Sequence, residues 1–167
     1  MYFPSATRVQ IFPEHFNGAF SPHLASGTWP RTVGQHLEIA LPPAPDSAAH
    51  ARQAAQALLA GHVRAAELHE TLILLSEVVM NAVCHPVPRA GAQVAVHVGV
   101  ARERIRAEVY DSGAGFDASA LSGEPGVDGG WGLVIVDRAA SRWGASTGER
   151  HCVWFELDRD VPMPRAA

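Results

Sequence analysis

Two polar residues that could act on a nucleotide lie in an otherwise apolar part of the chain. Apolar side chains recur there every three or four residues, a spacing that predicts an amphipathic helix over residues 68–83. They are Leu68, Leu72, Leu75, Val79 and Ala82. Glu77 and Asn81 are one helical turn apart, so they share a face. A carboxylate there can polarise a hydroxyl or water while the amide oxygen coordinates a metal, which suits phosphoryl transfer. An isolated Glu/Asn pair is, however, more often a solvated helix face.

A second polar site follows residues 104–110, in which apolar and charged residues alternate as in a half-buried strand. Asp111 is therefore expected at a strand end, where its carboxylate could accept a hydrogen bond from an exocyclic amine such as that of adenine. Gly113 and Gly115 would let the backbone approach a flat base, because they carry no Cβ atom. Asp-Ser-Gly is also an ordinary turn sequence. A calcium loop is disfavoured because its other acidic positions are missing.

The third site consists of glycines on both sides of Trp131, namely Gly129, Gly130 and Gly132. They precede the apolar segment 133–140, which predicts a helix that begins directly after them. Backbone N–H groups at a helix start attract phosphate, and the helix dipole contributes roughly 0.3–1 kcal/mol. A solvent-exposed glycine loop is the competing interpretation of this segment alone.

The three sites occur together and in this order, and the set resembles the Bergerat-fold, or GHKL, ATPases. It is most similar to the bacterial anti-sigma-factor serine kinases and their histidine-kinase-like relatives. Residues 75–85 resemble the N box of that family, residues 111–116 its first glycine box and residues 130–133 its second. The closing segment 153–157 is similar to the last strand of the anti-sigma-type members. The resemblance covers about residues 37 to 158.

The resemblance implies a role for each matched residue. Glu77 would be the general base, Asn81 the Mg²⁺ ligand and Asp111 the residue that reads adenine. The remaining matched residues would contact the base and the phosphates of ATP; they are Gly113, Gly115, Gly130, Gly132 and Leu133. ATP and Mg²⁺ are accordingly the expected cofactors. Many anti-sigma-like members have lost the first glycine box, and its presence here favours retained ATP binding.

Departures from the family pattern concern two cysteines and a proline. Relatives usually have Arg or Lys where Cys84 stands and Thr where Cys152 stands, so a phosphate contact and a contact near the base pocket are left open. Pro86 stands where relatives often have glycine, and it is expected to end the helix abruptly. Residues 117–129 occupy the place of the family's ATP lid and are expected to order over the triphosphate.

The resemblance leaves two functions open. The first is a cytoplasmic serine/threonine protein kinase that phosphorylates an anti-anti-sigma (STAS-like) partner and sequesters a sigma factor. The second is a catalytically weak, nucleotide-dependent protein-binding module. Retention of Glu77 favours the kinase. A sensor histidine kinase is disfavoured, because the chain is too short to add a dimerisation helix pair with its phosphoacceptor. The similar kinases often dimerise, so a homodimer is also open.

The composition of the chain excludes several other classes of protein. The 167 residues suit one domain, and a chain of this length buries roughly 70% of its unfolded surface. All 13 basic residues are arginine, which excludes a P-loop NTPase and a Schiff-base enzyme because both need a lysine amine. The net charge of −4 offers no broad basic surface for nucleic acid. Two cysteines, no signal-peptide pattern and no apolar run near ~18 residues fit a reduced cytoplasmic setting without a membrane span.

Three further patterns match other functions only formally. Residues 144–148 read Gly-x-Ser-x-Gly, the nucleophile elbow of hydrolases, but that motif needs a strand before the serine and a helix after it. The expected order here is the reverse. The cysteines and histidines lack the paired spacing of a zinc site. Arg102, Arg104 and Arg106 alternate on one expected strand, and they are expected to form a solvated face.

The pattern along the chain predicts an α+β, two-layer sandwich with helices on one face of a mixed, largely antiparallel sheet. Residues 1–32 would form a partly irregular N-terminal extension, residues 33–160 the ATP-binding domain and residues 161–167 a tail. Strands are expected at residues 35–41 (an edge strand), 93–100 and 104–110, and near Ala145 and Val153. Helices are expected from Asp46 or Ser47 to Gly61, over residues 68–83, and from residue 133 to about Trp143.

Overall fold

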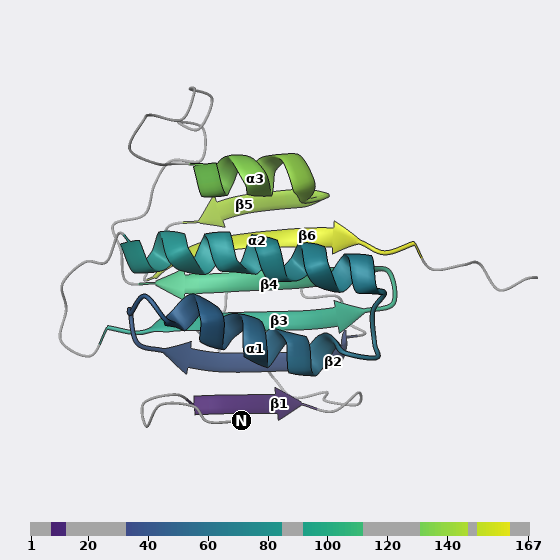
Figure 1. Cartoon of the computed structure of the whole chain (residues 1–167), viewed down its shortest axis with the longest axis horizontal. Coiled ribbons are helices and arrows are strands. Elements are labelled where there is room, and N and C mark those ends of the chain that lie inside the picture. Colours follow the sequence, from purple (N-terminus) through teal and green to yellow (C-terminus); the bar gives the residue numbers. More distant parts are fainter. Residues whose placement is uncertain (1–7, 13–32, 85–91, 112–130, 147–149, 161–167) are drawn as a thin grey trace, which may run out of the picture.

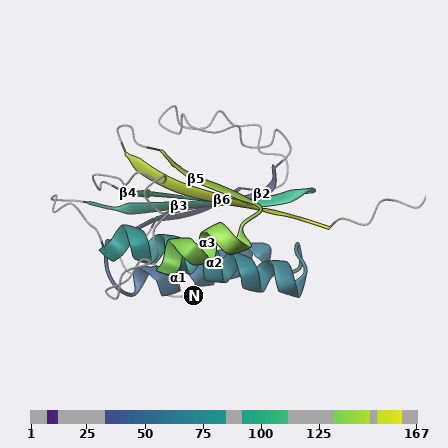
Figure 2. The ribbon, with the colours of Figure 1, turned by 90° about the horizontal axis from the view of Figure 1, so that it is seen from above.

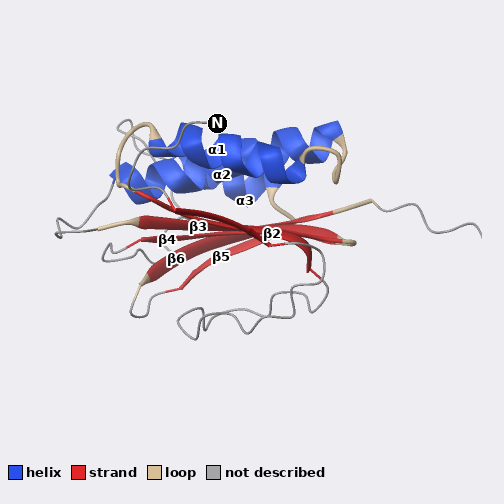
Figure 3. Cartoon of the chain, turned by 90° about the horizontal axis from the view of Figure 1, so that it is seen from below, coloured by secondary structure: helices blue, strands red, loops and turns tan. Residues whose placement is uncertain are grey.

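The described part of the chain forms two layers, with all of its helices on one face of a single sheet. The computed structural model describes residues 8–12, 33–84, 92–111, 131–146 and 150–160. The helices lie side by side over the sheet in Figure 1 and run roughly along the strands. Figures 2 and 3 show the two layers nearly edge-on. The predicted α+β sandwich is confirmed, although the described strands form a purely antiparallel sheet and not a mixed one. Within the described ranges, no helix combines the length and the apolar character that crossing a membrane requires.

The sheet runs in the order β1-β2-β3-β4-β6-β5, and each neighbouring pair in this order is antiparallel. The strands are β1 (Arg8–Phe12), β2 (Val33–Leu41), β3 (Val94–Ala101), β4 (Arg104–Asp111), β5 (Arg142–Ser146) and β6 (His151–Asp158). The helices are α1 (Ser47–Leu59), α2 (Ala65–Cys84) and α3 (Trp131–Ala139). Most expected elements are therefore present within a few residues of their predicted bounds.

Two expectations were wrong, one about an edge strand of the sheet and one about the end of the last helix. The strand at residues 35–41 is not an edge, because β1 from the N-terminal extension pairs with residues 36–40 of β2. The last helix does not reach Trp143 but ends at Ala139. Ser141 already donates its N–H to the carbonyl of Glu156, which starts the pairing of β5 with β6. The indole of Trp143 then donates to Asp137 at 2.8 Å, which ties the strand back to the helix.

The start of α1 differs from a simple side-chain cap. Asp46 is the N-cap residue, but its side chain makes no capping hydrogen bond. The hydroxyl of Ser47 instead donates to the carbonyl of Pro42 at 2.6 Å, which fixes the turn between β2 and α1. After α1, Gly61 has a φ of +81°, a left-handed conformation that glycine adopts without steric cost. The chain thereby reverses into α2.

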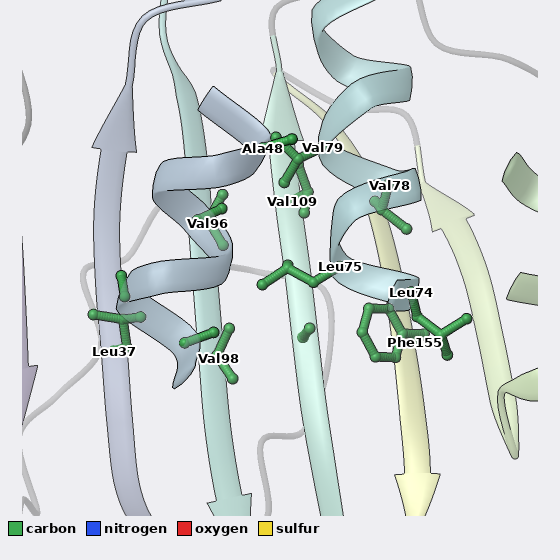
Figure 4. Close-up of a cluster of buried hydrophobic side chains, with 14 of the residues drawn as sticks. Leu37, Ala48, Leu74, Leu75, Val78, Val79, Val96, Val98, Val109 and Phe155 are labelled. Carbon is green, nitrogen blue, oxygen red and sulfur yellow. The ribbon is translucent and has the colours of Figure 1, made fainter. Parts of the chain in front are cut away.

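The core lies between α1, α2 and one face of the sheet. The buried face of α2 only partly matches the stripe predicted from the sequence. Leu75, Val79 and Ala82 of that stripe are buried, whereas Leu68 and Leu72 are partly buried. Leu74 and Val78, which the prediction left out, are buried too, and Figure 4 shows them beside Leu75 and Val79 against the sheet. Phe155 of β6 and Val109 of β4 lie in the same buried cluster. Because side chains alternate along a strand, Asp111 shares this face of β4 with Val109. The packing therefore fixes α2 relative to the end of β4.

The other face of β4 is buried as well, which the sequence did not predict. Arg106 is only 5% exposed, so it does not belong to a solvated face. Its guanidinium donates to Glu108 at 2.8 Å and to Glu156 of β6 at 2.9 Å. The hydroxyl of Tyr110 donates to the second oxygen of Glu108 at 2.6 Å, and Arg142 of β5 donates to Glu156 at 2.8 Å. The alternating charges of β4 thus form a buried network with two other strands.

Glu156 is the centre of this network. Burial alone would raise the pKa of its carboxyl, but hydrogen bonds from Arg142 and Arg106 outweigh burial and lower it. The carboxylate accepts from Arg104 at 3.3 Å as well. A buried charge pair is strongly destabilising when only one partner is removed, because the other charge is left uncompensated.

We predict that Glu156→Gln lowers the free energy of unfolding by about 1.5–3 kcal/mol, since the buried Arg106 would lose a charge-assisted hydrogen bond and keep only Glu108 as its counter-charge. Asp158→Asn is the matched control, because Asp158 also pairs with Arg142 but its side chain is 56% exposed. An exposed ion pair is worth less than about 1 kcal/mol. Urea denaturation of both variants at neutral pH measures the difference; equal, small losses would contradict the buried network.

Two histidines add an acid-sensitive element on the same face of the sheet. His36 of β2 and His97 of β3 have ring centroids 5.7 Å apart and are 6% and 2% exposed. Burial lowers the pKa of His36 from 6.5 to about 4. Burial, with the nearby charges of His36 and Arg150, lowers the pKa of His97 to about 3. Glu38, whose carboxylate is 4.0 Å from Nε2 of His97, does not offset this.

We predict that the free energy of unfolding falls as the pH drops below about 6.5, by up to about 1.4 kcal/mol per pH unit for each histidine. The unfolded chain takes up these protons near its ordinary pKa, whereas the folded chain excludes them until about pH 4 or 3. The stabilisation is complete above pH 6.5. The double variant His36→Gln/His97→Gln should flatten the slope between pH 6.5 and 5 in urea denaturation; an unchanged slope would contradict the assignment.

Candidate functional site

Four element ends meet at one end of the sandwich. The C-terminal ends of α2 and β4 and the N-terminal ends of α3 and β6 lie on the same side of the molecule in Figure 1. The ladder between β4 and β6 starts there, with Asp111 opposite His151. The N box and the second glycine box of the sequence analysis are brought to this place by α2 and α3. The first glycine box follows directly after β4.

The closest approach at this end is between α2 and α3. A Cβ atom built on Gly132 would lie 2.7 Å from Oε2 of Glu77 and 3.4 Å from its Cβ. No ordinary Cβ contact is that short, so the carboxylate of Glu77 occupies the space that a side chain at residue 132 would need. Gly132 is the second residue of α3, where N–H groups have no intrahelical partner and the helix dipole is positive. The carboxylate thus lies at a site of positive electrostatic potential.

Glu77 and Asn81 are partly exposed, whereas Val78, Val79 and Ala82 between and beside them are buried. The predicted helix and the shared face of the two polar residues are confirmed by the geometry of α2. Their side chains therefore lie at the border of the core, where a bound molecule can reach them. A carboxylate and an amide oxygen in this setting are suited to proton abstraction and to a hard cation, respectively.

Asp111 is the last residue of β4, and its side chain lies on the core side of the sheet. It is 7% exposed, and its Oδ2 is 3.1 Å from Nδ1 of His151 on β6. His151 is 5% exposed. Sequence reasoning did not assign His151 to this site, because the two residues are 40 positions apart and only the register between β4 and β6 joins them. An acidic residue at this strand end remains suited to accept a hydrogen bond from an amine.

Cys152, for which the sequence left a contact near the base pocket open, lies on the face of the sheet away from Asp111. Side chains alternate along β6, so Cys152 lies on the opposite face of the sheet from His151. There it is 2% exposed and packs with Tyr110 and Ala95. Burial and the charge of Glu108 raise the pKa of its thiol to about 12. Cys84 is exposed at the end of α2.

Other predicted residues divide into two groups. Leu133 is 7% exposed and belongs to the core cluster, so a contact between it and a nucleotide stays a prediction. Gly113, Gly115 and Gly130 lie outside the described residues, as does the lid segment 117–129. Their roles also stay predictions.

The rival chemistries gain no support from the geometry. Residues 144–146 of the formal hydrolase motif lie in β5, which follows α3 and precedes β6, the reverse of the order that a nucleophile elbow needs. In the part of the chain that the structure describes, no three His, Cys, Asp or Glu side chains gather into a group that could hold a metal ion.

Comparison with known proteins identifies the fold family. A family model described as a histidine kinase-like ATPase domain matches residues 41–157, which include α1, α2, β3, β4, α3, β5 and nearly all of β6. No curated protein matches the chain. The matched range contains Glu77, Asn81, Asp111 and Gly132, so the described part of the site lies within it. The chain therefore belongs to the histidine kinase-like ATPase domain family, and it is a GHKL-type ATP-binding module.

Proposed function

We propose that the protein is an ATP-dependent serine/threonine kinase of the anti-sigma-factor type, which phosphorylates an anti-anti-sigma (STAS-like) partner and sequesters a sigma factor. These partners would place it in the cytoplasm. The family match supports ATP binding. The observation that carries the proposal of catalysis is the carboxylate of Glu77 held against the backbone of Gly132 at the start of α3.

A carboxylate in this position favours chemistry over simple binding. Two like charges 4 Å apart near a protein surface repel by roughly 4 kcal/mol, so a carboxylate beside the phosphates would weaken ATP binding. A module that only binds ATP gains nothing from keeping it. A kinase needs a base at this place, because the hydroxyl of the acceptor has to lose its proton during phosphoryl transfer.

The residues present fit ATP and Mg²⁺. The first turn of α3 offers backbone N–H groups to phosphate. The missing side chain of Gly132 leaves room beside them for the carboxylate of Glu77. Asn81 provides the amide oxygen that a hard cation accepts, and Asp111 provides the acceptor for the amine of adenine. Mg²⁺ bound there would offset the negative charge of the phosphates. Glu77 would accept the proton of a serine or threonine hydroxyl while that oxygen attacks the terminal phosphorus and ADP leaves.

One observation favours a second function, a catalytically weak module that binds protein partners in a nucleotide-dependent manner. Cys84 is exposed at the end of α2, where the similar kinases have a basic residue. An uncharged thiol cannot replace a guanidinium or ammonium group as a phosphate ligand. The two functions differ in whether phosphate is transferred, which the following measurements decide.

We predict that Glu77→Gln binds ATP at least as tightly as wild type does, since a charge beside the phosphates is removed, but transfers its phosphate much more slowly, because the amide cannot accept the proton. Asp111→Asn should lower ATP affinity about tenfold to a hundredfold, since a hydrogen bond to a charged group contributes about 1.5–3 kcal/mol. Calorimetry with Mg-ATP and radiolabelled transfer to candidate partners encoded nearby measure both effects. Glu70→Gln, an exposed change on α2, is the control. Full transfer by Glu77→Gln would show that Glu77 is not the base, whereas no transfer by the wild type to any partner would favour the binding module.

We further predict that Gly132→Ala stabilises the fold slightly yet impairs transfer. Alanine is favoured over glycine within a helix by about 1 kcal/mol. The new Cβ would displace the carboxylate of Glu77, the flexible end of a side chain, from its place 2.7 Å away. Thermal melting and the transfer assay should therefore move in opposite directions. In a Glu77→Gln background the same change should affect transfer little; an equal loss there would mean that Gly132 acts independently of Glu77.

A further inference from the structure

The geometry points to His151 as a positioning residue that holds the carboxylate of Asp111 and thereby sets the preference for adenine over guanine. This inference rests on the proposed role of Asp111 in reading the base. No family motif assigned a role to His151, and only the pairing of β4 with β6 brings it to the site.

The contact is built into the sheet. Asp111 and His151 are directly opposite each other at the end of the β4–β6 ladder, and both side chains lie on the core side. Nδ1 of His151 is 3.1 Å from Oδ2 of Asp111. At 5% and 7% exposure, both groups are largely removed from water. The ring therefore restricts the rotation of the carboxylate where solvent contributes little.

The surroundings favour a donor at Nδ1. Val109 precedes Asp111 by two residues on the same face of β4, and Val153 follows His151 by two on β6; both are buried. A buried carboxylate next to apolar side chains needs hydrogen-bond donors, because burying a polar group without a partner is costly. The neighbouring cation, Arg150, reaches the backbone carbonyls of Gln93 and Tyr110 at 3.1 and 3.4 Å. Its guanidinium thus joins the backbone at the ends of β3 and β4, whereas His151 contacts the side chain of Asp111.

A carboxylate restrained in one orientation discriminates between purines. Adenine presents an amine that donates to it, whereas guanine presents a carbonyl oxygen at the equivalent ring position, and two acceptors repel. A site built around a fixed hydrogen bond rejects an analogue that leaves its polar group unpaired. A carboxylate that can rotate loses this discrimination, because its acceptor oxygens no longer stay at one place relative to the base. His151 would prevent the rotation.

The test compares amide replacements that put their N–H group at different places. The amide nitrogen of asparagine falls near the position of histidine Nδ1, and that of glutamine nearer to Nε2. His151→Asn should bind Mg-ATP within about threefold of wild type, whereas His151→Gln and His151→Leu should bind it about tenfold more weakly, the value of a lost charge-assisted bond. Calorimetry with Mg-ATP and Mg-GTP on the full chain should show the ATP-over-GTP ratio falling by a similar factor in the latter two variants only.

Three comparisons make the test decisive. In an Asp111→Asn background, His151→Leu should have little further effect on ATP affinity, because its action passes through the carboxylate. His69→Gln on the exposed side of α2 controls for loss of a histidine. Equal ATP-over-GTP ratios for His151→Asn and His151→Gln, with Asp111→Asn still weakened, would overturn the role of His151 and leave the proposed function intact. Failure of the wild-type protein to bind Mg-ATP would overturn both.

Discussion

The start of α3 lies against the carboxylate of Glu77 on α2, and the missing side chain of Gly132 leaves that carboxylate its room. A Cβ on residue 132 would lie 2.7 Å from Oε2 of Glu77, so the end of that side chain would have to move. This contact joins two sites that are more than 50 residues apart in the chain. The apolar face of α2 in turn holds Glu77 relative to the sheet, and the sheet carries Asp111. The geometry of the site therefore depends on one close approach of backbone to side chain.

The two faces of the sheet have different physical roles. The face toward the helices is apolar and ends in the polar pair of Asp111 and His151, at the edge where a ligand would enter. The other face carries the buried network of Arg106, Glu108 and Glu156, which pairs charges across β4 and β6. Replacing such a network with apolar side chains is often neutral or stabilising, so its presence contributes specific pairing more than stability. It fixes the same register that aligns Asp111 with His151.

Local patterns were sufficient to predict the parts of the fold that depend on neighbouring residues. The helical spacing of apolar side chains located α2 and placed Glu77 and Asn81 on one face, and alternation located β3 and β4. Long-range pairing was not predictable in this way. Arg106 was expected to be solvated, because its partner Glu156 lies on a strand 50 residues later in the chain. His151 was missed for the same reason, and β1 lies in an aromatic, proline-rich segment without clean periodicity.

The most direct test of the account is a crystal structure of the chain with Mg²⁺ and a non-hydrolysable ATP analogue. The account predicts one bound nucleotide, with its adenine amine at Asp111, its phosphates at the start of α3 beside Gly132, and the cation at the amide oxygen of Asn81. Crystals grown at saturating analogue that leave this end of the sandwich empty, or that hold the nucleotide elsewhere, would contradict it.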